Sequence, residues 1–383
     1  MNGLSRRLGR GSGTVIGGRV ALAIDPHALE RLSAHRHIIL VSGTNGKTTT
    51  TALIAEALGG AARNVTGSNM PAGHVAALAS DTNSVVVLET DEAYLPEVIA
   101  RTRPRVVCLL NLSRDQLDRA AEVRVMAEKW RAALHDTDAT VVANASDPLV
   151  TYAAIAQRES RVVWVGAGVS WSGDARSCPQ CTEPLNPEGT WRCDCGFARP
   201  DLDAELGDTL RVGDEEIPLS LALPGAFNRS NAALAALSAR ELGIPVPEAV
   251  ERMASLGAIA GRFTLRRRAN ATWRLLLAKN PAGVAALIDL VGDATHVVVS
   301  INDRVADGFD PSWLYDAPFD RLRGRHVWCS GDRALDVATR LDYADVDVTV
   351  CREGVPSIPG DEVVDVIANY TAFAEWMENS EPC

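Results

Sequence analysis

The sequence feature that most constrains the fold lies at residues 38–50, which read IILVSGTNGKTTT. An apolar run, His37–Ser42, leads into a glycine-containing loop, and a helical stretch, Thr48–Leu58, follows it. Gly43 and Gly46 lack a Cβ atom, so the backbone can turn tightly there and approach phosphate oxygens. The start of the helix directs N–H groups and a positive dipole at the same point. The segment therefore predicts a strand, a phosphate-binding loop and a helix, as in α/β proteins with parallel sheets.

Two side chains of this loop carry its expected chemistry. Lys47 supplies a positive charge for the β- and γ-phosphates of a nucleotide, and Thr48 offers a hydroxyl group to Mg²⁺. The loop departs from the common G-x-x-x-x-G-K-T spacing, because Val41 stands where the first glycine would be. The alternative is a glycine turn followed by a Thr-rich helix, which would not require Lys47. The residues expected to bind the nucleotide are Gly43, Thr44, Asn45, Gly46, Lys47, Thr48 and Thr49.

Apolar runs rich in Val and Ile alternate with helical stretches along most of the chain, which predicts a mainly parallel, doubly wound sheet. The strands expected in the first part are His37–Ser42, Val85–Glu89, Val106–Asn111, Thr140–Asn144 and Val162–Gly166, and the helices include Thr48–Leu58, Arg124–Leu134 and Asn231–Leu242. A second α/β pattern has strands at Leu275–Lys279, Thr295–Ile301, His326–Cys329, Asp347–Cys351 and Glu362–Val366. We expect an N-terminal extension (1–36), a nucleotide-binding domain (37–260) and a C-terminal α/β domain (261–383).

Composition favours a globular protein and argues against nucleic-acid-binding, membrane-spanning and secreted classes. The hydrophobic fraction of 46% is typical of a globular chain, and the net charge of -11 argues against a nucleic-acid partner. The sequence contains no apolar run of about 18 residues, so no transmembrane helix is expected. The N-terminus has arginines among glycines and lacks the apolar core of a secretory signal. The expected compartment is the cytoplasm.

Four of the eight cysteines gather in a small inserted module at about residues 172–203. Cys178 and Cys181 have the C-x-x-C spacing of a metal knuckle, whereas Cys193 and Cys195 form a C-x-C pair, which is one residue shorter. Four thiolates suit tetrahedral Zn²⁺, and a site made only of protein ligands is structural. A pair of disulfides is the alternative, and it is disfavoured in a cytoplasmic chain.

Carboxylates follow the expected strand Val85–Glu89, in the sequence VLETDEAYLP. Glu89, Asp91 and Glu92 would lie at the carboxyl edge of the sheet, where ligands bind in folds of this class. Carboxylate oxygens are ligands that Mg²⁺ prefers. A solvated acidic strand end is the alternative.

Three further segments are only turns or helix starts when they are considered alone. The run NLSRDQLDR begins at Asn111 and places Asp115 and Asp118 near a helix dipole. The run LPGAFNRSNA offers Asn228 and Asn231 as helix caps. The run TGSNM, at residues 66–70, is a glycine-containing turn.

These segments together resemble the Mur ligases, and most closely their MurT family. Gly-Thr-Asn-Gly-Lys-Thr is similar to the loop of Mur ligases and folylpolyglutamate synthases. Four further features resemble MurT: the Glu-x-Asp-Glu-Ala-x-Leu-Pro run, the Asp-Gln-Leu-Asp-Arg run, the cysteine cluster, and INDRVADGFDPSWLYD at 301–316. Gln116 stands where most Mur ligases have a metal-binding His, and Phe227 stands where His is commoner. The resemblance extends from about His37 to Phe373.

The resemblance implies a Mur-type central P-loop ATPase domain with an inserted four-cysteine zinc ribbon, followed by a Rossmann-like α/β domain. It also implies ATP and Mg²⁺, with Glu89 as a magnesium ligand and Asn228 on the adenine and ribose side of ATP. Gly261-Arg262-Phe263 would be the hinge that ends the central domain, and the TGSNM run would face the substrate.

The activity implied is amidation of the α-carboxylate of D-isoglutamate in lipid II through an acyl phosphate, at the cytoplasmic face of the membrane. No cysteine lies in a Gly-x-Cys-x-Gly elbow, so ammonia would come from a GatD-type glutamine amidotransferase in a heterodimer. Asp310, with Asp307 as second choice, would complete the Cys–His pair of that partner. Lys47 and Glu89 would serve the ATP-dependent step.

Other interpretations remain open at this point. A peptide-forming ligase of the Mur or folylpolyglutamate type would share the phosphate loop, but the cysteine module and Gln116 argue against it. A non-catalytic nucleotide-binding regulatory subunit is disfavoured because Lys47, Thr48 and Glu89 are intact. Without the resemblance, the acidic run at 301–316 would be a solvated loop.

Overall fold

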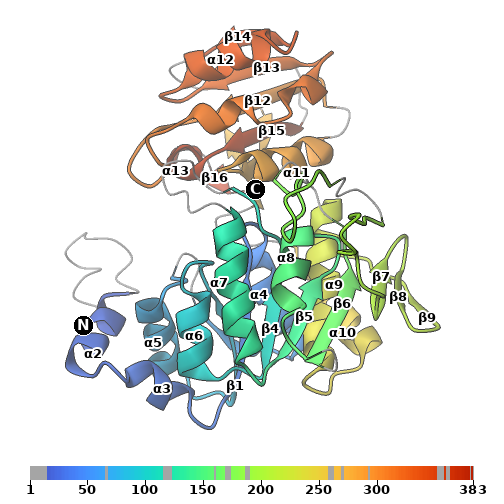
Figure 1. The fold of residues 1–383 in the computed structure, drawn as a ribbon. Coiled ribbons are helices and arrows are strands. Elements are labelled where there is room, and N and C mark those ends of the chain that lie inside the picture. The colour runs from blue at the N-terminus through green and yellow to red at the C-terminus, as the bar shows by residue number, and fades with distance from the viewer. Residues whose placement is uncertain are drawn as a thin grey trace. The chain divides into compact units, whose positions relative to one another are not determined.

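The computed structural model describes residues 15–64, 68–114, 123–158, 161–168, 174–185, 190–257, 263–268, 271–291, 294–351, 358, 363–379 and 381–382. These residues form two compact units (Figure 1). The first contains most of the chain up to Gly257, and the second most of the chain from Ala258 onward. The expected boundary between residues 260 and 261 lies outside the described residues, as do Gly261 and Arg262.

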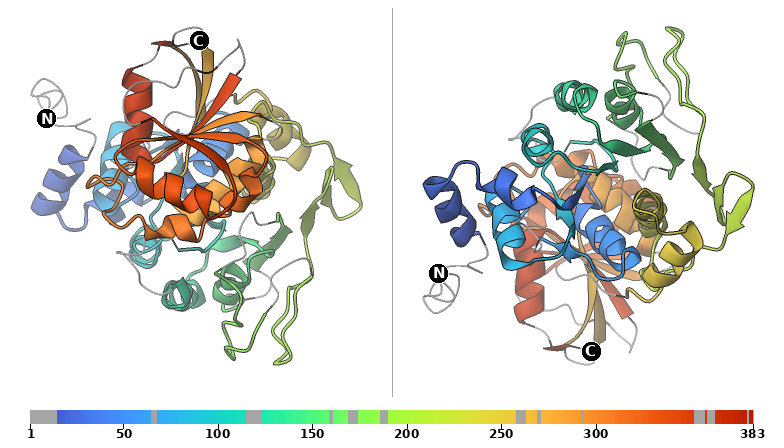
Figure 2. Two further views of the ribbon diagram at one scale, coloured as in Figure 1. Left: turned by 90° about the horizontal axis from the view of Figure 1, so that it is seen from above. Right: turned by 90° about the horizontal axis from the view of Figure 1, so that it is seen from below.

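The first unit is built on a sheet with the strand order β2-β3-β1-β4-β5-β6-β7-β8-β9. Its strands are β1 (His37–Ser42), β2 (Ala62–Arg63), β3 (Val85–Glu89), β4 (Val106–Leu109), β5 (Thr140–Asn144), β6 (Val162–Gly166), β7 (Ala204–Leu206), β8 (Leu210–Val212) and β9 (Glu215–Ile217). Neighbouring strands from β2 to β7 are parallel, and β7 to β9 extend one edge in antiparallel fashion (Figure 2). The predicted α/β class with a parallel sheet is confirmed.

Helices cover both faces of this sheet, which explains why its central strands are apolar on both sides. One face packs against α3 (Ala28–Ser33), α5 (Pro71–Ser80), α6 (Leu95–Thr102), α7 (Val123–His135) and α8 (Pro148–Ala154). The opposite face carries α4 (Lys47–Ala57), α9 (Ala226–Arg240) and α10 (Val246–Met253), as Figures 1 and 2 show. The N-terminal helix α2 (Ile16–Ile24) packs on α5. The glycine loop thus lies between a buried strand and a buried helix.

Helix α9 begins at Ala226, five residues before the start that the sequence suggested. Gly225, with a φ of 97°, immediately precedes it and sets this start, because a left-handed residue cannot continue a helix. Asn228 and Asn231 consequently lie inside the first turns of α9, and both are buried. The interpretation of these asparagines as helix caps was wrong.

The second unit contains a sheet with the order β14-β13-β12-β15-β11-β10-β16. Its strands are β10 (Phe263–Arg268), β11 (Ala271–Leu277), β12 (His296–Ser300), β13 (His326–Ser330), β14 (Asp347–Val350), β15 (Val363–Ala368) and β16 (Glu381–Pro382), and its helices are α11 (Pro281–Val291), η3 (Ser312–Tyr315), η4 (Phe319–Leu322), α12 (Ala334–Asp342) and α13 (Tyr370–Glu378). Strands β11 to β15 pair in parallel. The antiparallel β10 and β16 were not expected, and β11 starts four residues earlier than expected.

The cysteine module consists of loops over its described residues, 174–185 and 190–203. Two isolated bridges, Ser177 to Pro184 and Arg192 to Ala198, close its two turns. Its small core combines two of the cysteines with Leu185, Trp191 and Phe197. Among the described residues of the whole chain, no helix is long and apolar enough to cross a membrane.

Candidate functional site

The glycine loop joins β1 to α4 with a backbone that requires glycine at two positions. Gly43 has a φ of 149° and Gly46 a φ of 88°, both in the region that L side chains rarely adopt. A Cβ atom on Gly46 would lie 2.6 Å from Oδ1 of Asn231. Glycine is therefore needed for the turn and also for the close approach of α9 to the loop.

Residues that follow β4 hold the loop in shape. The Asn45 N–H donates to Oδ1 of Asn111 at 2.9 Å, and Nδ2 of Asn111 donates back to the Asn45 carbonyl at 3.0 Å. Thr44 exchanges two hydrogen bonds with the backbone of Ser113, both of 2.9 Å. These contacts hold the loop in its curved shape.

Lys47 lies inside the curve of the loop and is 6% exposed. Its ammonium group donates to the carbonyl oxygens of Gly43 and Thr44 and to Oε2 of Glu92, the last at 2.9 Å. A buried ammonium requires such partners, because an uncompensated charge in the interior costs several kcal/mol. Thr49 follows in the first turn of α4 and is also buried. The structure thus brings the seven predicted nucleotide-binding residues of the loop together at one point.

Thr48 and Glu89 face each other beside the loop. The Thr48 hydroxyl donates to Oε2 of Glu89 at 2.8 Å, and Glu89 is 3% exposed at the end of β3. A hydroxyl and a carboxylate are hard oxygen donors, the set that suits Mg²⁺. These two residues could therefore hold the ion, with water and phosphate oxygens as its remaining ligands.

Sequence reasoning missed two residues that contact the main chain of Glu89. The amide of Asn64 bonds both the N–H and the carbonyl of Glu89, at 2.8 and 2.9 Å. Nε2 of His74 lies 2.8 Å from the same carbonyl oxygen and must carry its proton there, because a carbonyl only accepts. Burial lowers the pKa of His74 to about 4, so the ring is neutral. The sequence gives no signal for either role, since Asn64 follows a strand of only two residues.

The remaining residues singled out in the sequence lie in α9 or outside the described part of the chain. Asn228 is 6% exposed in α9, the helix whose Asn231 touches the loop. Thr66, Asp115, Gln116 and Asp118 lie outside the described residues. Their expected roles remain predictions.

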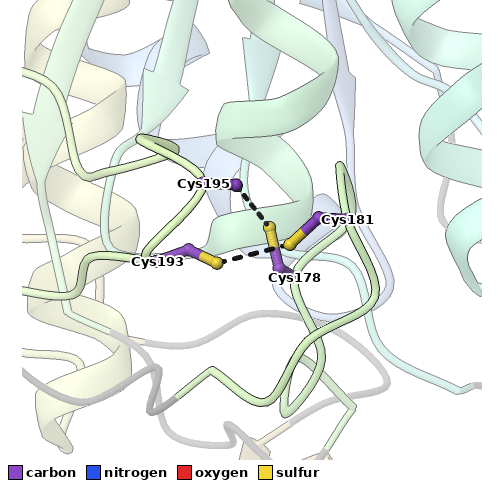
Figure 3. A group of neighbouring side chains, drawn as sticks. All are labelled: Cys178, Cys181, Cys193 and Cys195. Carbon is purple, nitrogen blue, oxygen red and sulfur yellow. Dashed lines mark hydrogen bonds between the residues drawn. The ribbon is translucent and has the colours of Figure 1, made fainter.

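The four clustered cysteines converge from two loops (Figure 3). Their Sγ atoms all lie within 4.8 Å of one another, with 3.7 Å between Cys178 and Cys195 and 3.5 Å between Cys181 and Cys193. A disulfide would require about 2.05 Å. Four thiolates around Zn²⁺, each with a bond of about 2.3 Å, would place their sulfurs about 3.8 Å apart. The cluster therefore has the dimensions of a tetrahedral thiolate site.

Both turns of the module have backbone hydrogen bonds that orient the cysteines. In the first turn the Thr182 N–H donates to the Cys178 carbonyl at 2.9 Å. In the second, Gly196 donates to Cys193 at 3.0 Å and adopts a φ of 94°. The shorter C-x-C spacing is thus accommodated by a glycine turn, and Cys195 still reaches the cluster.

The aspartates of the run at 301–316 have separate partners in the second unit. Asp307 is 5% exposed, and its carboxylate accepts the N–H of Thr371 at 2.9 Å as well as the Thr371 hydroxyl. Asp310 is exposed and accepts the Ser312 N–H at 2.8 Å, which lowers the pKa of Asp310 below its ordinary value. Asp307 therefore ties its loop to the start of α13, whereas Asp310 presents a charged carboxylate at the surface.

Comparison with known proteins identifies the family. Residues 41–239 match the Mur ligase middle domain, and residues 277–373 match the MurT ligase C-terminal domain. The chain is 30% identical to "Lipid II isoglutaminyl synthase (glutamine-hydrolyzing) subunit MurT" of Staphylococcus aureus (strain N315), over 98% of this chain and 94% of that protein. The chain belongs to the MurT family. The MurT protein of Streptococcus pneumoniae (strain ATCC BAA-255 / R6) is 29% identical over 97% of this chain and 93% of its own length.

Solved structures show the same fold as this MurT family member. A pseudomurein peptide ligase type C from Methanothermus fervidus has a TM-score of 0.69 at 18% identity, covering 89% of this chain and 79% of that one. A structure of MurF from Acinetobacter baumannii has a TM-score of 0.65 at 15% identity, covering 92% and 79%. The predicted Mur-ligase architecture is confirmed.

Proposed function

We propose that the chain is the synthetase subunit of a lipid II isoglutaminyl synthase and amidates the α-carboxylate of D-isoglutamate during peptidoglycan synthesis. The observation that carries this proposal is the assembly of Lys47, Thr48 and Glu89 around the glycine loop in a chain of the MurT family. Lipid II is anchored in the membrane, so the chain would act at its cytoplasmic face.

The proposed reaction has two steps. A carboxylate oxygen of the substrate attacks the γ-phosphorus of ATP, ADP leaves, and an acyl phosphate forms. Ammonia then attacks the acyl carbon, phosphate leaves, and loss of a proton from nitrogen gives the amide. The acyl phosphate is required because a free carboxylate has no adequate leaving group.

The residues of the loop would bind and orient ATP for the first step. Backbone N–H groups at the start of α4 hold the phosphates, and Lys47 places its charge beside the transferred group. Mg²⁺ held by Thr48 and Glu89 would offset negative charge on the phosphoryl group. The Glu92 carboxylate pairs with Lys47 at 2.9 Å and helps to hold its ammonium group beside the loop.

Asp310 is the proposed contact with a glutaminase partner of the GatD type. Its exposed carboxylate is held by Ser312 and stays ionised at neutral pH, as an orienting carboxylate for a partner His requires. The rigid attachment of the same loop through Asp307 keeps Asp310 in place. We assign the orienting role to Asp310 because the carboxylate of Asp307 is already engaged within the fold.

The experiment that tests this function supplies the chain with ATP, Mg²⁺ and lipid II, and with either ammonium or glutamine. Conversion of carboxyl to amide is followed by mass spectrometry. We expect amidation with ammonium and none with glutamine until the partner is added. An adduct formed only with amino acids would instead identify a peptide-forming ligase, and ATP binding without turnover would identify a regulatory subunit.

We also propose that the four cysteines hold a structural Zn²⁺. The spacing of their sulfurs fits the ion, and the described residues of the module form a small apolar core, which is too little to fold alone. Metal binding in such modules supplies much of the folding free energy.

Replacement of Cys178 by Ser should remove zinc and unfold this module. Zinc content measured by mass spectrometry is expected to fall from one ion per chain to nearly none. The buried Cys108, which lies in β4 of the main sheet, provides the matched control: Cys108→Ser should retain zinc. Full zinc content in a folded Cys178→Ser protein would contradict the assignment.

A further inference from the structure

Among the described residues, the end of β3 has a neighbouring strand on one side only. On that side Glu89 is paired in register with Val41 of β1, within the regular parallel ladder, while its own N–H and carbonyl point to the other side. On the other side β2 pairs only Ala62 and Arg63 with β3, and the ladder stops before Glu89. The side chain of Asn64 continues it, since Oδ1 accepts the Glu89 N–H and Nδ2 donates to the Glu89 carbonyl.

His74 adds a second donor to the same carbonyl oxygen from the start of α5. Its side chain is 0% exposed, as the interior of the unit surrounds it. Asn64 also bonds the Ser68 carbonyl at 2.9 Å, and a Cβ atom on Gly73 would lie 2.1 Å from that oxygen. Asn64, the start of α5 and the end of β3 are therefore packed together at the main chain of Glu89.

We propose that Asn64 and His74 are positioning residues for the magnesium ligand Glu89. By fixing the backbone of Glu89 they restrict where its carboxylate can lie, and the Thr48 hydroxyl then orients it. Residues that orient a ligand from behind typically change metal affinity about 10- to 100-fold when they are removed. The inference rests on the proposed function only in taking Glu89 as a ligand of the nucleotide-bound ion.

The test measures metal binding without catalysis. Mn²⁺ affinity in the presence of a non-hydrolysable ATP analogue is determined by electron paramagnetic resonance for the full chain and its variants. We expect Asn64→Ala and His74→Leu to weaken Mn²⁺ binding about 10-fold. His74→Gln should bind nearly as well as the unaltered chain, because its amide N–H can still donate to the Glu89 carbonyl.

Asn83→Ala is the matched control, since Asn83 is exposed just before the opposite end of β3. Thermal unfolding midpoints separate a role in positioning the metal ligand from a role in stability alone. A merely structural role would lower the midpoints of Asn64→Ala and His74→Leu and leave Mn²⁺ affinity unchanged, and this outcome would overturn the proposal. If Asn64→Ala does not fold, the comparison of His74→Leu with His74→Gln decides alone.

Failure of the positioning role and failure of the proposed function give different results in this experiment. If the unaltered chain binds Mn²⁺ with nucleotide but forms no amide on lipid II, the function is refuted while the affinities still test the positioning role. If the unaltered chain binds no Mn²⁺ with nucleotide, Glu89 is not a metal ligand, and the proposed positioning role of Asn64 and His74 is refuted.

Discussion

Asp310→Asn is expected to abolish amidation with glutamine and to leave amidation with ammonium unchanged. An amide cannot stabilise the charged form of a partner histidine, and it favours the wrong tautomer of the ring. In serine protease triads the same exchange lowers kcat by roughly 10⁴-fold. The measurement compares initial rates of lipid II amidation with the two nitrogen sources, in the complex with the glutaminase partner.

Because Asp310 is exposed, an effect of its substitution on activity can be separated from an effect on folding. The side chain lies at the surface, so the substitution should not disturb the core of the second unit. Asp320→Asn, at another exposed aspartate of the same unit, is the control and should retain both activities. Loss of both activities in a folded Asp310→Asn protein would refute the proposed role, because ammonium-driven synthesis does not need the glutaminase.

Asp307 and Asp310 show where sequence reasoning stops. Both occur in one polar run, and their spacing does not indicate which carboxylate turns inward. The structure separates them because Thr371, more than sixty positions later, offers Asp307 both a backbone N–H and a hydroxyl. A contact between residues so distant in sequence has no local signature.

The strand, the glycine loop and the helix that follows it were predictable because the sequence pattern is local. Glycines at 43 and 46, Lys47 and Thr48 are adjacent in sequence, and the strand before them is an unbroken apolar run. The strands β1, β3, β5 and β6 have the predicted bounds for the same reason, since parallel strands covered on both faces contain little but Val, Ile and Leu.

The surroundings of Glu89 were not predictable, although Glu89 itself was singled out. Asn64 acts through two backbone hydrogen bonds to a residue 25 positions away, and β2 is too short to show a periodic pattern. His74 lies in a helix whose other buried residues are ordinary apolar ones. A lone buried histidine is most simply interpreted as core, and only the position of its Nε2 relates it to the site.

Lys47→Ala is expected to lower amidation by at least 10²- to 10³-fold with ammonium as well as with glutamine. One preorganised charge beside a transferring group contributes roughly this much. Because both nitrogen sources depend on the acyl phosphate, both should fail together, unlike the result expected for Asp310→Asn. Nucleotide affinity, measured by titration calorimetry, should fall as well.

The Lys47→Ala variant needs a control for stability, because Lys47 forms an ion pair with Glu92. Removing the ammonium deprives the Glu92 carboxylate, which is only 13% exposed, of one cationic partner, and the loss of a partner from a buried ion pair destabilises a fold by several kcal/mol. The double variant Lys47→Met with Glu92→Gln removes both charges together and should restore the thermal midpoint without restoring activity. Lys129→Ala, at an exposed lysine of α7, should behave as the unaltered chain. If the folded double variant amidated lipid II at a rate within ten-fold of the unaltered chain, the charge of Lys47 would not be needed for phosphoryl transfer.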